Sequence, residues 1–182
     1  MSPLATRGLN RFCIIQNVTA DPPIHLRNVR DDDEQFLIEL YAGTRAAEVA
    51  AFGWDQARID AFLKMQFCVR QQAYRMQFPN ADHSVIEFDG LPAGSLIVDR
   101  SKERISLTDI AVLPGFRGRG IASQIIRRLQ AEATDSDRSM VLQVDKTNAN
   151  ALRLYQSLGF VIIADAGFTY EMTWPAPAPS SG

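Results

Sequence analysis

The chain has little of what disulfide and metal proteins are built from, with two cysteines and two histidines in 182 residues. Cys13 and Cys68 are far apart and have no CxxC spacing, which favours reduced thiols over a disulfide framework. His25 and His83 do not cluster with them, so we expect no zinc or other metal site.

Long hydrophobic runs and a strong charge of one sign are also missing. No apolar run approaches the roughly 20 residues of a transmembrane helix, and residues 1–10 lack the apolar core of a secretory signal peptide. The formal net charge of −2 gives no general attraction to nucleic acid or to an anionic membrane surface. We therefore expect a cytoplasmic protein without nucleic-acid or membrane partners.

What is present is the composition of a globular domain, with 46% hydrophobic and 22% charged residues. The length is enough for one sizeable core. Residues 1–23 show no clear periodicity and are interpreted as an N-terminal leader, and residues 175–182 form a Pro/Ala/Ser tail that cannot bury a core. The folded domain is therefore expected over residues 24–174.

Hydrophobic periodicity predicts the order β-α-α-β-β-β-α-β-α-β-β within this domain. The first half is expected to be antiparallel, with a hairpin turn at Asp89-Gly90, whereas the second half needs a parallel crossover. The predicted fold class is α/β, with a mixed, largely antiparallel central sheet and helices on both faces. Strands are expected at residues 24–29, 84–88, 93–98, 104–113, 140–144, 160–163 and 168–174.

Two helical segments carry further expectations. The acidic run at residues 31–34 is interpreted as a solvated helix start, where the helix dipole favours negative charge. Asp55 is expected to cap the next helix, with Cys68 packed among its apolar residues. The stripe expected to face the core of that helix is Ile59, Phe62, Met65, Val69, Ala73 and Met76.

The most informative stretch is residues 109–123, where an apolar strand ends at Pro114 and a turn of alternating arginine and glycine leads into an amphipathic helix. A helix start presents free backbone N–H groups and a favourable dipole, and glycine lets an anion approach the backbone closely. The turn therefore predicts a phosphate site, with an ordinary strand-to-helix turn as the alternative. A dinucleotide G-x-G-x-x-G fingerprint fits worse, because Ser123 stands at the third glycine position.

Two motifs together resemble one family. Arg117-Gly118-Arg119-Gly120-Ile121-Ala122 fits the Q/R-x-x-G-x-G/A signature of the GNAT superfamily of N-acetyltransferases. Residues 148–160 resemble the second motif of that family, N-x-x-A-x-x-L-Y-x-x-x-G-F. Both motifs stand in the family order within a GNAT-like succession of strands and helices across roughly residues 24–174.

The resemblance implies that acetyl-CoA is a cosubstrate and that its acetyl group passes directly to a primary amine in a ternary complex. Backbone N–H groups of residues 118–123 would hold the pyrophosphate, and the strand edge at 110–112 would pair with the pantetheine arm. The implied cosubstrate-binding residues are Ile110, Ala111, Val112, Arg117, Gly118, Arg119, Gly120, Ile121, Ala122, Ser123, Asn148, Ala151 and Leu154.

Tyr155 is the implied general acid, since a phenol near the sulfur can donate a proton as the thiolate leaves. The alternative is an aromatic ring that only packs between helix and sheet. The backbone N–H of Val112 would meet the charge that develops on the thioester oxygen.

The general base is less defined. Gln143 and Ser106 stand where family members carry a glutamate, so neither familiar position holds a carboxylate. Asp109 is the nearest carboxylate on the central strand, and it is equally interpretable as a base or as a structural aspartate. Glu87 and His83 are weaker alternatives, and a water chain without a dedicated base is also possible.

The acceptor is expected beside the first two helices, a region with Tyr41, Arg45, Glu48, Phe52, Trp54, Phe67, Tyr74 and Arg75. Their mixed chemistry allows a small molecule or a peptide amine and does not choose among them. Two other functions stay open: a non-catalytic CoA-binding scaffold or sensor, suggested by Gln143, and an acyltransferase for longer acyl-CoAs. The family resemblance allows a homodimer through an edge strand, with 168–174 as the candidate, and equally a monomer.

Overall fold

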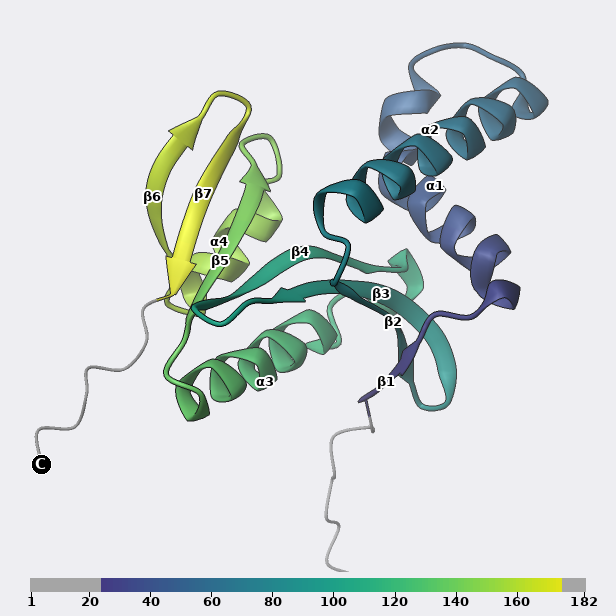
Figure 1. The fold of residues 1–182 in the computed structure, drawn as a ribbon. Coiled ribbons are helices and arrows are strands. Elements are labelled where there is room, and N and C mark those ends of the chain that lie inside the picture. Colours follow the sequence, from purple (N-terminus) through teal and green to yellow (C-terminus); the bar gives the residue numbers. More distant parts are fainter. Residues whose placement is uncertain (1–23, 175–182) are drawn as a thin grey trace, which may run out of the picture.

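The structure, a computed structural model, describes residues 24–174 (Figure 1), so the expected leader and tail lie outside the described residues. The predicted order of elements is confirmed, with short 3-10 turns at Asp31–Asp33 and Pro114–Phe116. No helix within 24–174 combines the length and the apolarity needed to cross a bilayer. The elements are β1 (Ile24–Asn28), α1 (Glu34–Ala50), α2 (Gln56–Gln77), β2 (Asp82–Phe88), β3 (Leu91–Arg100), β4 (Arg104–Val112), α3 (Ile121–Asp135), β5 (Ser139–Asp145), α4 (Ala149–Ser157), β6 (Val161–Ala166) and β7 (Thr169–Trp174).

The strands form one sheet in the order β1-β2-β3-β4-β5-β7-β6. Neighbouring strands are antiparallel except for β4 and β5, which are parallel and are connected through α3. Helices α1 and α2 lie over one face of the sheet and α3 lies over the other (Figure 1). The predicted fold class, a mixed and largely antiparallel sheet with helices on both faces, is therefore confirmed.

Apolar side chains form two separate clusters. The larger cluster packs α3 and α4 against the sheet and contains fully buried side chains such as Ile125, Ile126 and Met140. The smaller cluster joins α1 to α2 through Leu37, Tyr41, Val49, Leu63 and Phe67. The α1–α2 pair is thus a small unit with its own core, placed over β3 and β4 (Figure 1).

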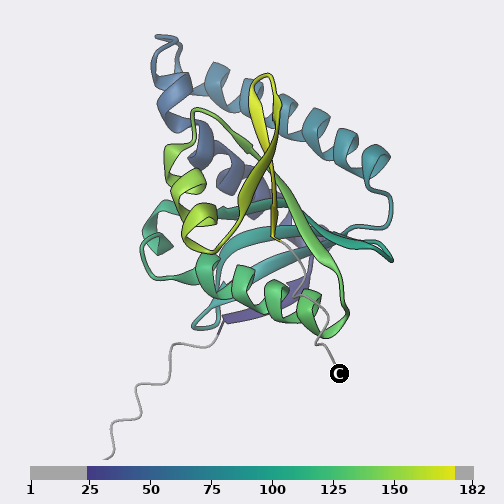
Figure 2. The same ribbon diagram turned by 90° about the vertical axis from the view of Figure 1, so that its left-hand side faces the viewer.

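The parallel strands β4 and β5 separate after a short stretch of pairing. They pair only from Arg104 to Leu107 on β4, although β4 continues to Val112 beside β3. The separation coincides with a β-bulge, because Val98 and Ile97 of β3 face Leu107 and Asp109, which leaves Thr108 as an extra residue. A bulge bends its strand and increases the local twist, so the far half of β4 leaves its parallel neighbour. Figure 2 shows β5 and the β6–β7 hairpin turning away from the remaining strands.

The stripe expected to bury α2 is wrong in four of its six members. Met65, Val69 and Met76 are 56%, 62% and 77% exposed, Ala73 is exposed as well, and Cys68 is exposed rather than packed. The buried residues of α2 are Leu63 and Phe67, which belong to a helical face that continues with polar side chains. Periodicity of apolar residues failed here because that inward face carries Gln66, Arg70 and Gln71. The expected cap at Asp55 is confirmed, since its carboxylate accepts from the Arg58 backbone N–H at 2.9 Å.

The last strand is not an edge of the sheet, which corrects its candidacy for a strand-to-strand dimer contact. β7 lies between β5 and β6, so β6 is the edge strand at this end of the sheet and β1 is the edge strand at the other. Every residue of β6 is exposed, including Val161, Ile162 and Ile163. Any pairing of this edge with another chain would therefore involve β6.

The acidic run before α1 is not simply solvated, because Asp33 is buried and ion-paired. Both of its carboxylate oxygens accept from Arg27 at 2.7 Å, and the Arg30 backbone N–H donates to it at 2.8 Å. The Nε of Arg27 also donates to Glu87 on β2 at 2.7 Å. This cluster ties the start of α1 to the first two strands. The hydrogen bonds from Arg27 lower the pKa of Asp33 to about 2.

Asp33→Asn is expected to lower the free energy of unfolding at pH 7 by about 2 kcal/mol. This figure is the free-energy equivalent of the difference between the ordinary pKa of an aspartate and the lowered pKa of Asp33. A lowered pKa in the folded state means stability that is present above about pH 4 and is lost as the pH falls toward 2. Urea unfolding at several pH values measures both effects. The exposed Asp32→Asn is the matched control, and equal losses in the two variants would contradict the assignment.

Candidate functional site

The turn between β4 and α3 presents a row of backbone N–H groups without protein acceptors. Gly118 and Gly120 have φ values of 76° and 75°, in the left-handed region that glycine adopts without steric cost. The first backbone bond at the start of α3 runs from the Gln124 N–H to the Gly120 carbonyl, at 2.9 Å. Within residues 24–174, the N–H groups of 118–123 donate to no protein acceptor. Free donors at the positive end of a helix dipole suit a phosphate or pyrophosphate.

The two arginines of this turn behave differently. The guanidinium of Arg119 lies 5.6 Å from the ring centre of Phe88 and 5.4 Å from that of Phe116. The Nε of Arg117 instead donates to the Val112 carbonyl of β4, at 3.0 Å. The guanidinium of Arg119 therefore lies against two aromatic rings and makes no ion pair within residues 24–174, whereas Arg117 donates to the Val112 carbonyl on the free edge of β4.

The free edge of β4 leads directly into the turn. The Leu113 N–H donates to the Ala93 carbonyl on the β3 side, at 2.8 Å. Backbone groups alternate between the two edges of a strand, so the N–H groups of Ile110 and Val112 point toward the gap left by β5. Such an edge can pair with an extended ligand. The Ile110 N–H is thus a second donor on this edge. The sequence analysis had named only the N–H of Val112.

Thr108, the extra residue of the bulge, adds an unsatisfied polar atom to this region. Its hydroxyl is buried, and it has no hydrogen-bond partner among the described residues. Buried polar atoms in proteins are almost always paired, so an unpaired one indicates a role for a ligand or for ordered water. The hydroxyl, the free strand edge and the N–H groups of the turn together fit a long molecule with phosphates at one end.

Tyr155 lies on α4, next to the gap, with its ring buried against Phe160 at a centroid distance of 5.9 Å. Burial, together with the negative charge of Asp109, raises the pKa of the Tyr155 hydroxyl to about 12. The hydroxyl forms no hydrogen bond with residues 24–174, so its proton is available to a ligand. Asp109 and Tyr155 are thus close enough to influence one another electrostatically, although they are far apart in sequence.

Two polar contacts position α4. The Asn148 side chain accepts from the Ala151 backbone N–H at 3.1 Å and caps the helix. The buried Gln130 of α3 donates to the Leu158 carbonyl at 2.7 Å, which holds the other end. Ala151 and Leu154 pack against the larger core. The oxygen of Asn148 is therefore committed to the cap, and its amide N–H₂ remains the group that could donate to a ligand.

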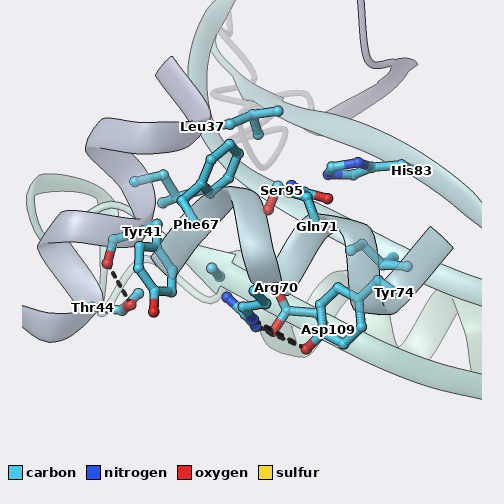
Figure 3. Close-up of a pocket in the computed structure, with 13 residues that line it drawn as sticks. Leu37, Tyr41, Thr44, Phe67, Arg70, Gln71, Tyr74, His83, Ser95 and Asp109 are labelled. Atoms are coloured by element: carbon cyan, nitrogen blue, oxygen red, sulfur yellow. Dashed lines mark hydrogen bonds and ion pairs between the residues drawn. The ribbon is translucent and has the colours of Figure 1, made fainter. Parts of the chain in front are cut away.

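Asp109 is paired with Arg70 of α2 inside a small pocket (Figure 3), with the Arg70 Nη2 to Asp109 Oδ1 distance at 2.7 Å. Arg70 also donates to the Tyr74 hydroxyl, at 3.0 Å from Nη2 and 3.2 Å from Nε. Burial raises the pKa of Asp109, and the charge of Arg70 opposes this shift only in part. The pocket is lined by Leu37, Leu40, Tyr41, Thr44, Phe67, Arg70, Gln71, Tyr74, His83, Ser95, Ile97, Asp109 and Ala111.

The other candidate bases are less well placed. Glu87 is engaged by Arg27. His83 lines the pocket, where burial and the charges of Arg75 and Arg70 lower its pKa. Gln143 pairs in register with Glu171 of β7, a carboxylate that sequence analysis did not name. Among the described residues, no group of three or more His, Cys, Asp or Glu side chains could hold a metal ion.

The structure gathers only part of the expected acceptor region. Tyr41, Phe67 and Tyr74 line the pocket, whereas Arg45 and Glu48 pair with each other on the surface at 2.7 Å. Phe52 and Trp54 instead form an aromatic group with Phe62. Arg75 borders a second groove beside the start of α1. Arg70, Gln71 and Ser95 were missed, and the one available signal was the run of polar residues on the inward face of α2.

Comparisons with known proteins show the family and the fold of the chain. The model of the Acetyltransferase (GNAT) family matches residues 23–160, so the chain belongs to this family. A mycothiol acetyltransferase of Frankia casuarinae is 37% identical over 67 residues, which cover 34% of this chain and 19% of that protein.

Two solved structures share the fold. The PaiA N-acetyltransferase of Thermoplasma acidophilum, crystallised with coenzyme A, has a TM-score of 0.62 and 13% identity, and the match covers 84% of this chain and 99% of that chain. The ribosomal-protein-S18-alanine N-acetyltransferase of Escherichia coli has a TM-score of 0.57 and 19% identity, with 87% and 98% covered.

Gly118→Ala is expected to weaken acetyl-CoA binding about tenfold, because a Cβ would stand in the turn and the left-handed backbone would be strained by about 1 kcal/mol. Isothermal titration calorimetry measures the affinity. Gly167→Ala is the matched control, since Gly167 has φ of 78° and, like Gly118, open space at its Cβ position, but lies in the β6–β7 turn. Equal affinities in the two variants would contradict a phosphate site at residues 118–123.

Proposed function

We propose that this chain is an acetyl-CoA-dependent N-acetyltransferase that acts in the cytoplasm on a primary amine of a small molecule or peptide. The observation that carries the proposal is the free edge of β4 running into a turn of unpaired N–H groups, at residues 110–123. Family membership supports the same reaction class.

The donor, acetyl-CoA, would bind along this surface. The N–H groups of 118–123 would hold the pyrophosphate, and Arg119 would add charge from its aromatic support. The edge at Ile110–Val112 would pair with the pantetheine arm, and this pairing requires Arg117 to release the Val112 carbonyl that it now occupies. Asn148, Ala151 and Leu154 would line the arm from α4.

Tyr155 would act as the general acid. The amine nitrogen attacks the thioester carbon, the carbon–sulfur bond breaks with its electron pair on sulfur, and the phenol supplies the proton that makes free CoA thiol. Transfer of this proton to a thiolate whose thiol has an ordinary pKa near 8.5 is unfavourable, because the phenol is the weaker acid. Burial in the gap also raises the pKa of the thiol, which narrows the difference between the thiol pKa and the phenol pKa. The N–H groups of Ile110 and Val112 would stabilise charge on the thioester oxygen.

Asp109 would take the proton that the ammonium loses before attack. Its raised pKa makes it a better proton acceptor than an exposed aspartate. The second proton, released from nitrogen as the amide forms, would restore the Tyr155 phenol through solvent, so that one proton leaves the enzyme per turnover. This arrangement needs acceptor and donor together in a ternary complex and no covalent enzyme intermediate.

Two other functions are distinguishable. A non-catalytic CoA-binding scaffold would bind CoA and release no thiol with any amine, and an acyltransferase for longer chains would prefer longer acyl-CoAs in competition. The position of Asp109 near Tyr155 favours catalysis over the scaffold, despite the glutamine at Gln143. A homodimer, if formed through strand edges, would use β6 or β1.

The proposed function is tested first by the melting temperature of the protein with acetyl-CoA, CoA and NADH. A ligand of the native state raises the melting temperature, so we expect a rise with acetyl-CoA and CoA and none with NADH. Thiol release over a panel of amines then tests turnover. No rise with either CoA ligand would remove the basis of the proposal.

Tyr155→Phe is expected to lower kcat about a hundredfold and to leave acetyl-CoA affinity unchanged, because only the donated proton is lost. Since the pKa of Tyr155 is about 12, the wild-type rate should also show no decrease from ionisation of Tyr155 below about pH 11. Thiol-release rates across pH test both points. Full turnover in the Phe variant, with thiolate departure limiting the rate, would exclude the assigned acid.

A further inference from the structure

In the Arg70–Asp109 ion pair, one nitrogen of the guanidinium and one oxygen of the carboxylate form no hydrogen bond with the described residues. Arg70 reaches Asp109 only through Nη2, which contacts Oδ1 (Figure 3). Within residues 24–174, neither Nη1 of Arg70 nor Oδ2 of Asp109 has a hydrogen-bond partner. The two side chains keep 31% and 21% of their surface exposed. A guanidinium and a carboxylate that are each half used, side by side in a pocket, can accept a second pair of charges.

Arg70 is held rigidly enough to act as a recognition group. Its guanidinium lies 5.5 Å from the ring centre of Tyr41 and 5.0 Å from that of Tyr74. The Tyr41 hydroxyl in turn donates to the Gln66 side chain at 3.2 Å. A guanidinium whose plane is fixed between aromatic rings loses little freedom when it binds, and its parallel N–H groups match the geometry of a carboxylate.

Three further polar side chains of the pocket have no hydrogen-bond partner in the part of the chain that the structure describes. Gln71, His83 and Ser95 make no side-chain hydrogen bond within the described residues, although Ser95 is buried. Because burial and neighbouring arginines lower the pKa of His83, the charges in this pocket at neutral pH are those of Arg70 and Asp109, which cancel. The pocket has a volume of about 20 Å³, so it holds only the polar end of a ligand, and its lining suits an end without net charge.

A ligand with a single charge would leave either Arg70 or Asp109 without its counter-charge. A simple amine at the free Oδ2 that gave its proton to Asp109 would neutralise the carboxylate and leave the Arg70 guanidinium without its counter-charge. Removing one partner of a partly buried ion pair is strongly unfavourable. A molecule that carries an ammonium group and a carboxylate on the same carbon atom can supply both partners at once.

We propose that the acceptor is a free α-amino acid, bound with its carboxylate on Arg70 and its amino group at Asp109. The assignment rests on the proposed acetyl transfer and specifies its substrate class. When Arg70 turns to the carboxylate of the ligand, Asp109 loses the cation that restrains its basicity and can take the proton of the ammonium group. Attack on the thioester then proceeds as described above and yields an N-acetyl amino acid, CoA thiol and one proton.

The test compares matched acceptors with the full chain and acetyl-CoA. For each amino acid, thiol release is measured alongside its primary amide and its decarboxylated amine. At least one free amino acid should exceed both analogues by about a hundredfold in kcat/KM, since a pocket built for a carboxylate rejects ligands that lack it. Equal kcat/KM for an amino acid and its analogues would overturn the assignment while acetyl transfer stands. If none of the amines caused thiol release, the proposed function would be overturned, and this assignment with it.

Variants of Arg70 provide a second measurement. Arg70→Gln should reduce the preference for amino acid over amide at least about tenfold, mainly through KM, and Arg70→Lys should restore part of it. Acetyl-CoA affinity should not change, which separates loss of recognition from loss of folding. Lys64→Gln removes the same charge from the exposed side of α2 and should leave the preference intact. An unchanged preference in folded Arg70→Gln would exclude a carboxylate contact.

Discussion

The separation of β4 from β5 is the constraint on which the rest of the site depends. Two parallel strands that stayed paired would satisfy their own backbone groups and leave no edge for a ligand. Pairing stops at Leu107, and the extra residue Thr108 bends β4 away over its last residues. The same separation leaves backbone donors on the edge and lets Tyr155 of α4 lie within electrostatic reach of Asp109. The opening is thus made by the register of the sheet.

The two helices over the open face follow from this constraint. Polar residues on the inward side of α2 would be misplaced against a closed sheet, because buried polar groups need partners. Over an open sheet they line a pocket, where Arg70 meets Asp109 across 39 positions of sequence. The Arg27–Asp33–Glu87 cluster fixes the entry of α1 relative to β1 and β2. Since α1 packs on α2 through Tyr41 and Phe67, this cluster also sets the position of the pocket.

Local conflicts in the sequence coincide with the site, as expected where function competes with folding. Apolar residues of α2 such as Val69 are exposed, while Arg70 and Gln71 point inward. Asp109 is held in a setting that raises its pKa, and the Thr108 hydroxyl is buried without a partner. Each of these features costs stability in the isolated chain. Together they mark the side of the sheet where an acceptor would meet the donor.

Sequence patterns alone predicted the order of elements, the mixed sheet and the turn at residues 117–123, because each depends on neighbouring residues whose periodicity or backbone freedom is local. They also identified Tyr155 and Asp109 as candidates, through their place in or near contiguous motifs. They could not predict the Arg70–Asp109 pair, the burial of Asp33 or the edge position of β6. These depend on which distant segments the tertiary structure brings together, and on which face of each helix then meets the sheet. Contiguous motifs therefore determined where a donor could bind, and only long-range packing decided which side chains form the proposed acceptor pocket.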